Sequence, residues 1–163
     1  MTSAAATALA VLILDQLSKL LALQRLPLGR PVSLIDGFFS LTLVLNPGLA
    51  FGMLADTPAG WRWVVALLSI GALAVLAVVG LRMLPGGGPL TPVALGFIFG
   101  GAVGNLIDRI GSGHVTDFIE LPPWPPFNVA DVCITFGVVL LVLIYLREGV
   151  REERARKQGE KGG

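Results

Sequence analysis

The sequence contains few charged residues, one cysteine and one histidine. Charged side chains make up 14% of its 163 residues and hydrophobic ones 54%, and the mean hydropathy is +0.79. A soluble domain of this size needs far more polar surface, so that class is excluded. The lone Cys133 excludes an intrachain disulfide and any multi-cysteine metal site. Its place in an apolar run favours a buried, small apolar side chain.

Long apolar runs take the place of polar surface. Residues 63–81 and 89–107 carry no charge, and residues 129–146 carry only Asp131. Each run is long enough to cross a hydrocarbon layer of ~30 Å as a helix. Together with an apolar N-terminal run, they predict an all-α polytopic membrane protein of one domain, with four transmembrane helices at residues 4–26, 61–82, 89–110 and 128–147.

The N-terminal run is interrupted by Asp15 and Lys19. A cleaved signal peptide has a basic n-region followed by an unbroken apolar stretch, and this run has neither, so we expect a retained helix. The spacing of the two residues predicts an ion pair on one helix face. A second interpretation is that they orient a neighbouring active site.

Residues 27–60 have the composition of an outer β and loop region. Within them, residues 32–45 are rich in β-branched and aromatic side chains around a turn at Asp36-Gly37. We therefore expect short strands here, forming a small extracytoplasmic β element between helices 1 and 2.

Basic residues crowd the C-terminal tail, residues 148–163, and Arg82 ends the second helix. The positive-inside rule therefore predicts that both termini are cytoplasmic and that residues 27–60 and 111–127 lie together on the outer side. The basic residues of the tail alternate with acidic ones and lack aromatic partners. We expect a solvated helix end near anionic lipid, and no nucleic-acid partner.

The third helix has a packing face made of glycines. Gly96, Gly100 and Gly104 recur at every fourth residue, which permits close approach of another helix backbone. The next step of this row is an aspartate, and the adjacent row is also polar. The polar side chains that this helix brings to the outer membrane boundary are Asn105, Asp108 and Arg109.

Two aspartates flank a turn rich in proline and tryptophan. Asn128 is a natural helix N-cap with Asp131 at the third helical position, where a carboxylate complements exposed amides without any catalysis. Asp117 taken alone is equally explained as a solvated loop carboxylate. If the turn brings the two acids together, one holds a proton while the other accepts one. Such a pair activates water for attack on a peptide carbonyl without a metal or cofactor.

Other chemistries are open but less well supported. Ser18 beside Lys19 is typical of a serine–lysine hydrolase, yet adjacent helical residues point ~100° apart. His114 with the two aspartates resembles a metal site, but it lacks a helical HExxH pattern and is equally explained as a polar loop residue. A non-enzymatic alternative is a small transporter or assembly subunit whose carboxylates form an ion path at different depths.

Five short motifs in collinear order resemble the lipoprotein signal peptidase, or signal peptidase II, family of bacterial membrane aspartic proteases. They are LDQLSK at 14–19, NPGLAFG at 46–52, GGAVGNLIDR at 100–109, HVTDFIE at 114–120 and FNVAD at 127–131. The resemblance implies a multi-pass enzyme of the bacterial inner membrane, monomeric and without a cofactor, with its active site near the outer face. Its partners would be membrane lipids and prolipoproteins carrying diacylglycerol, cleaved just before the lipidated cysteine.

The resemblance also implies functions for particular residues. Asp117 and Asp131 would form the catalytic dyad, with no metal. The strands of residues 32–45 would form a surface cradle, and residues 51–61 a mobile loop over the site. Residues that would hold substrate or support the site are Asp15, Lys19, Asn46, Gly48, Asn105, Asp108, Arg109 and Asn128.

Overall fold

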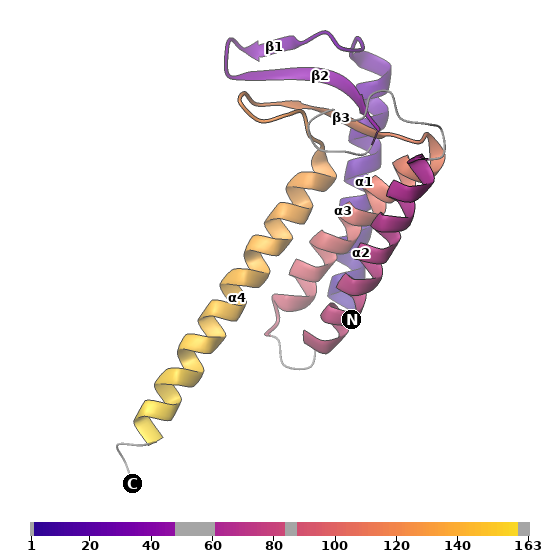
Figure 1. Cartoon of the computed structure of the whole chain (residues 1–163). Coiled ribbons are helices and arrows are strands. Elements are labelled where there is room, and N and C mark those ends of the chain that lie inside the picture. Colours follow the sequence, from indigo (N-terminus) through magenta and orange to yellow (C-terminus); the bar gives the residue numbers. More distant parts are fainter. Residues whose placement is uncertain (1, 48–60, 84–87, 160–163) are drawn as a thin grey trace.

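The computed structural model describes residues 2–47, 61–83 and 88–159. The four helices form a bundle, and a small sheet covers one end of it (Figure 1). The N-terminus and the end of α4 lie away from the sheet, and α4 diverges from the other helices along its length. In chain order the elements are α1 (Thr2–Arg25), β1 (Val32–Ile35), β2 (Phe39–Asn46), α2 (Trp61–Met83), α3 (Thr91–Gly111), β3 (Val115–Glu120) and α4 (Val129–Gly159).

The predicted polytopic fold with four helices is confirmed. Within the described residues, three helical stretches are long and apolar enough to cross a membrane: Ser3–Arg25, Thr91–Gly111 and Val129–Val150. A shorter apolar stretch, Trp63–Val78, lies within α2. The last helix continues to Gly159, past the predicted boundary at residue 147, so much of the predicted tail is helical.

Polarity is distributed as expected for helices that face lipid. Leu67 and Leu68 of α2 are 66% and 67% exposed, whereas Asp15 and Asn128 are 0% exposed. A soluble protein buries its leucines and exposes its carboxylates. Here the polar side chains face the interior of the bundle, which is where ionisable groups of membrane proteins gather around functional sites.

Helix α3 is the central helix because its glycines bring it into backbone contact with two neighbours. A Cβ atom on Gly100 would lie 2.5 Å from the carbonyl oxygen of Ala8 in α1, and one on Gly101 would lie 2.5 Å from that of Ala130 in α4. No side chain fits at either position without moving a backbone. The predicted glycine row, which faces α1 as a unit, is Gly96, Gly100 and Gly104.

The sheet is antiparallel in the order β1-β2-β3. The predicted strands and turn are confirmed, with Gly37 at φ 72° between β1 and β2. The third strand was not predicted: β3 comes from between α3 and α4 and pairs with β2, placing Asp117 opposite Val44. The sheet packs on the end of α1 through a cluster formed by Ala22, Leu43 and Phe118.

Candidate active site

Asp117 lies on strand β3, not in a loop, and is only 3% exposed. Its Oδ2 atom accepts a hydrogen bond from Nδ2 of Asn46 at 3.0 Å, and its Oδ1 atom accepts one from Nδ2 of Asn128 at 2.7 Å. Asn46 is the last residue of β2, so the pairing of β2 with β3 brings this donor to the acid. The interpretation of Asp117 as a solvated loop carboxylate is therefore wrong.

Asp131 occupies the third position of α4, as predicted, and Asn128 is the residue before the helix. The backbone N–H of Asp131 donates to Oδ1 of Asn128 at 3.1 Å, and the backbone N–H of Asn128 donates to Oδ2 of Asp131 at 3.2 Å. This reciprocal pair is a capping box, which satisfies two amides that have no partner within the helix. Capping fixes the carboxylate of Asp131 at the start of α4.

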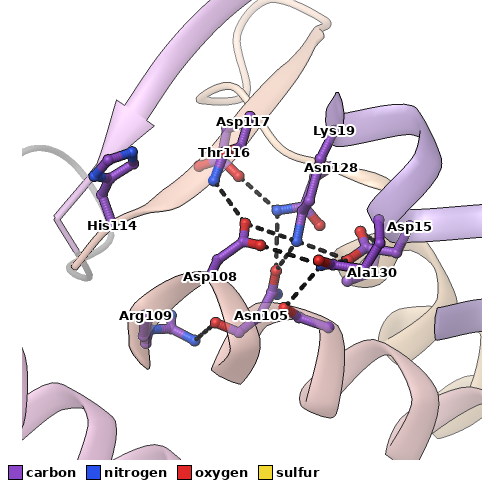
Figure 2. Close-up of polar contacts among 12 residues, drawn as sticks. Asp15, Lys19, Asn105, Asp108, Arg109, His114, Thr116, Asp117, Asn128 and Ala130 are labelled. Carbon is purple, nitrogen blue, oxygen red and sulfur yellow. Dashed lines mark hydrogen bonds and ion pairs between the residues drawn. The ribbon is translucent and has the colours of Figure 1, made fainter. Parts of the chain in front are cut away.

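The amide side chains of Asn105 and Asn128 connect Asp117 with Asp131. Figure 2 shows the two amides beside Asp117. Asn128 donates through Nδ2 both to Asp117 and to Oδ1 of Asn105, the latter at 3.2 Å. Asn105 in turn donates through Nδ2 to Oδ1 of Asp131 at 2.9 Å. Both carboxylates thus receive N–H donors from one hydrogen-bonded chain drawn from α3, β3 and the start of α4.

A buried ionic cluster lies on the other side of Asn105. Lys19 pairs with Asp15 at 2.8 Å, which confirms the predicted ion pair, and with Asp108 of α3 at 3.1 Å. Its Nζ atom also donates to Oδ1 of Asn105 at 2.8 Å. Gln16 joins the same carboxylates, donating to Asp15 at 3.3 Å and to Asp108 at 3.1 Å.

The carboxylates of Asp15 and Asp108 also accept hydrogen bonds from the backbone next to Asp117 and Asp131. Asp108 Oδ2 accepts the N–H of Thr116, which precedes Asp117, at 3.0 Å. Asp15 Oδ1 accepts the N–H of Ala130, which precedes Asp131, at 2.9 Å. Helices α1 and α3 therefore determine where strand β3 and helix α4 present their acids.

A cavity of about 310 Å³ opens between α2, α3 and α4. Its polar lining consists of Ser69, Asn105, Arg109 and Asp131, and the remaining walls are apolar. The Nε atom of Arg109 is buried and has no hydrogen-bond partner among the residues that the structure describes. This cavity therefore offers a guanidinium donor next to a carboxylate, an arrangement suited to holding a polar backbone in apolar surroundings.

The environment of Asp117 favours its protonated form. The pKa of Asp117 is raised from its ordinary 3.8 to about 6, mainly by burial and also by the negative charge of Asp131. Hydrogen bonds from Asn46 and Asn128 and the charge of Lys19 oppose this rise. Desolvation dominates because a carboxylate inside the protein loses more hydration than these donors return.

Residues 7–147 match the signal peptidase (SPase) II family. The chain belongs to this family. Its members are aspartic peptidases, and the chain is a multi-pass bacterial membrane protein.

Relatives within the signal peptidase II family align with most of the chain. It is 44% identical to the lipoprotein signal peptidase of Moorella thermoacetica, covering 82% of this chain and 86% of the relative. For the lipoprotein signal peptidase of Pseudomonas aeruginosa the identity is 42%, covering 92% and 87%. A solved bacterial membrane enzyme superposes with a TM-score of 0.71 at 26% identity, covering 90% of this chain and 94% of that one.

Most residues implied by the resemblance to signal peptidase II meet in one network. Hydrogen bonds or ion pairs join six of the supporting residues with Asp117 and Asp131 or with the ionic cluster, and Arg109 donates to the carbonyl oxygen of Asn105 at 3.4 Å. Gly48 and residues 51–60 of the expected mobile loop at 51–61 lie outside the described residues. The network consists of Asp15, Lys19, Asn46, Asn105, Asp108, Asp117, Asn128 and Asp131, with Arg109 at its edge.

The alternative chemistries lack support in the geometry of this signal peptidase II family member. Ser18 donates to the carbonyl oxygen of Asp15 at 2.8 Å, while Lys19 is engaged with carboxylates, so the two do not form a serine–lysine pair. His114 stands apart from the network (Figure 2). Among the residues that the structure describes, no group of three or more His, Cys, Asp or Glu is arranged to hold a metal ion.

Three participants were missed from the sequence: Gln16, Thr116 and Ala130. The last two contribute only backbone N–H groups, which any residue type supplies, so side-chain chemistry gave no signal. Gln16 stands next to Asp15 in an apolar helix, and a polar side chain at that depth was an available signal.

Proposed function

We propose that this chain removes the signal peptide from diacylglyceryl-modified prolipoproteins, cleaving just before the lipidated cysteine, with Asp117 and Asp131 as its catalytic dyad. One observation carries the proposal. Two carboxylates from different elements are joined through one residue, Asn128. Its Nδ2 atom donates to Asp117 at 2.7 Å, and its backbone N–H donates to Oδ2 of Asp131 at 3.2 Å. A helix cap alone does not require the second carboxylate.

The dyad works by transferring protons to and from water and the departing amine. Asp131 takes a proton from a water molecule, and the resulting hydroxide attacks the scissile carbonyl carbon. As the C–N bond breaks, Asp117 gives its proton to the departing amine. The raised pKa of Asp117, about 6, supports its assignment as the acid.

The cavity between α2, α3 and α4 is the proposed site for the peptide backbone around the cleavage point. Its walls are apolar, as an extended signal peptide requires, while Asn105 and Arg109 supply donors for backbone carbonyls. Asp131 lines this cavity and also a largely apolar groove of about 550 Å³ along α4, between Trp124 and Val139. We assign the groove to the acyl chains, because it needs no polar contacts.

Membrane orientation and oligomeric state complete the proposal. The sheet end of the bundle would face the outer side and both termini the cytoplasm, because the basic residues of the tail belong inside. The enzyme would act as a monomer without cofactor, as the resemblance to signal peptidase II implies. Gly48 and the 51–60 segment would contact the substrate.

The decisive experiment is cleavage of a purified diacylglyceryl-modified prolipoprotein by wild type, Asp117→Asn and Asp131→Asn, each checked for folding by thermal unfolding. Ser18→Ala serves as the control, because it also tests the serine–lysine alternative. We expect both Asn variants to fold and to lose activity by at least about 1,000-fold, the scale of losing an acid–base pair, while Ser18→Ala cuts normally. Near-normal turnover by either folded Asn variant would refute the dyad.

A further inference from the structure

Lys19 uses every donor that it has. Its side chain is 3% exposed, and Nζ lies 2.8 Å from Asp15, 3.1 Å from Asp108 and 2.8 Å from Oδ1 of Asn105. An ammonium has three N–H donors and no acceptor, so these three partners account for all of them. Two carboxylates suffice to neutralise the charge, which leaves the contact with Asn105 unexplained by ion pairing.

This third contact fixes which way the amide of Asn105 faces. The atom beside an ammonium has to be an acceptor, so it is the oxygen, and the amide nitrogen is turned towards Asp131, 2.9 Å away. In the flipped orientation an N–H₂ group would face an ammonium and an oxygen would face a carboxylate. Both contacts would be repulsive at once.

The orientation of Asn105 in turn favours one orientation of the amide of Asn128. Because the oxygen of Asn105 is directed inward, it also accepts from Nδ2 of Asn128 at 3.2 Å. That amide nitrogen donates to Asp117 at 2.7 Å, and the oxygen of Asn128 is left to accept the N–H of Asp131. One ammonium thus determines the direction of one hydrogen bond to each aspartate, from Asn105 to Asp131 and from Asn128 to Asp117.

We propose that Lys19 is a positioning residue that sets the orientation of Asn105 and Asn128 and so directs N–H donors at both acids of the dyad. The inference rests on the proposed function of Asp117 and Asp131. Without Lys19 the amide of Asn105 is free to turn its oxygen towards Asp131, a contact that is favourable only when that carboxyl is protonated. The state that accepts a proton from water then becomes rarer, so turnover falls although the substrate contacts remain.

The chain contains a matched control for this idea. Gln16 bonds to the same two carboxylates as Lys19, and to the carbonyl oxygen of Gly104, but it has no bond to either amide. Gln16→Leu therefore disturbs the ionic cluster without releasing Asn105. The charged groups that surround the two amides, and that any pH profile will also report, are Asp15, Lys19, Asp108, Arg109, Asp117 and Asp131.

The test is a double-mutant cycle on cleavage of the lipidated prolipoprotein, using Lys19→Met, Asn105→Ala and the double variant. We expect Lys19→Met to lower kcat by roughly 100-fold, the effect of a displaced reacting group, with KM little changed. If Lys19 acts through Asn105, the double variant has the kcat of Asn105→Ala within about twofold. If the loss of kcat in the double variant equals the product of the losses in the two single variants, the inference is overturned.

The pH profile gives a second readout. A carboxylate that loses an N–H donor holds its proton to higher pH, so the acidic limb of kcat/KM should move upward in Lys19→Met. Gln16→Leu and Lys19→Arg should keep the wild-type limb, since an arginine is also a donor without an acceptor. An equal shift of the acidic limb in Gln16→Leu would mean that Lys19 acts only through its ion pairs, not through the amide of Asn105.

If Lys19→Met does not fold, Lys19→Gln replaces it in the same cycle, because glutamine presents both a donor and an acceptor and leaves the amide of Asn105 unfixed. The two proposals fail in distinguishable ways. If Asp117→Asn or Asp131→Asn is active, the proposed catalytic dyad is refuted, and the positioning role of Lys19 with it. If both aspartate variants are inactive but the losses of kcat in Lys19→Met and Asn105→Ala multiply in the double variant, the dyad stands. Only the positioning role of Lys19 is then refuted.

Discussion

The carboxylate of Asp15 accepts the backbone N–H of Ala130 at 2.9 Å, so a residue of the first helix holds the first turn of the last one. The leading N–H groups of a helix lack partners within it and attract negative charge. A buried aspartate from a neighbouring helix supplies both the acceptor and the charge. The position of Asp131 in the dyad is therefore set partly by α1.

Removing this anchor should destabilise the bundle and misplace the acid. Asp15→Ala leaves the N–H of Ala130 without its acceptor and removes one of the two counter-ions of Lys19. We expect a loss of about 3 kcal/mol in the free energy of unfolding, the usual scale for breaking a buried ion pair, together with lost cleavage. Thermal unfolding in detergent measures the first effect. Asp15→Asn, which keeps an acceptor oxygen, should lose less; equal losses would mean that the hydrogen bond is unimportant.

Capping and donation by Asn128 are separable. Serine caps a helix about as well as asparagine, but it has no amide to donate to Asp117 and Asn105. Asn128→Ser should therefore be more stable than Asn128→Ala by about 1 kcal/mol. Both variants should lose cleavage to a similar extent. Thermal unfolding and a cleavage assay on the same preparations decide this, and a Ser variant with wild-type kcat would show that only the cap matters.

The raised pKa of Asp117 makes stability depend on pH. Its folded pKa, about 6, lies above its ordinary 3.8, so the folded state binds this proton more tightly than the unfolded state. The resulting stability is fully present below about pH 4 and is lost as the pH rises through about 6, at most about 3 kcal/mol.

Asp117→Asn cannot titrate, so it should lack this dependence. We expect the difference in unfolding temperature between wild type and Asp117→Asn to shift in favour of the variant between pH 4 and pH 7. Thermal scans in one detergent at a series of pH values measure it. Parallel curves for the two proteins across this range would contradict the raised pKa.

Close approach of α3 and α1 at Gly100 should not tolerate even a methyl group. A Cβ there would lie 2.5 Å from the carbonyl oxygen of Ala8, and a backbone atom cannot move away cheaply. Gly100→Ala should lower the free energy of unfolding by about 1–3 kcal/mol, as overpacking does. Gly111→Ala in the same helix is the control, since its Cβ meets nothing within 4 Å. Equal thermal stability of the two variants would rule out tight packing.

The helices and much of the site could be predicted because their causes are local. Apolar length alone indicated the helical spans, and the spacing of Gly96, Gly100 and Gly104 indicated the packing face of α3. The capping box was predictable because Asn128 and Asp131 lie within one helical turn. Each of these features is decided by residues near one another in the chain.

Strand β3 and the contacts around it could not be predicted in the same way. VTDFIE is too short to show a period, although four of its six residues favour strands, and only pairing with β2 orders it. The bond between Asp15 and Ala130 joins positions 115 residues apart through a backbone group. No pattern of side chains reports such a partner, so the burial of Asp117 and the position of α4 required the folded structure.

Asp15 and Lys19 are the only charged residues of α1 before Arg25, and they pair within the helix itself at 2.8 Å. During biosynthesis the first helix leaves the ribosome long before α3 and its Asp108 exist. An unpaired charge in a nascent transmembrane helix costs about 2.5–3.5 kcal/mol near the bilayer centre. Because the two charges neutralise each other within one helical turn, α1 can enter the bilayer before the other helices are made. The same pair then binds Asp108 of α3 and the backbone of Ala130 in α4.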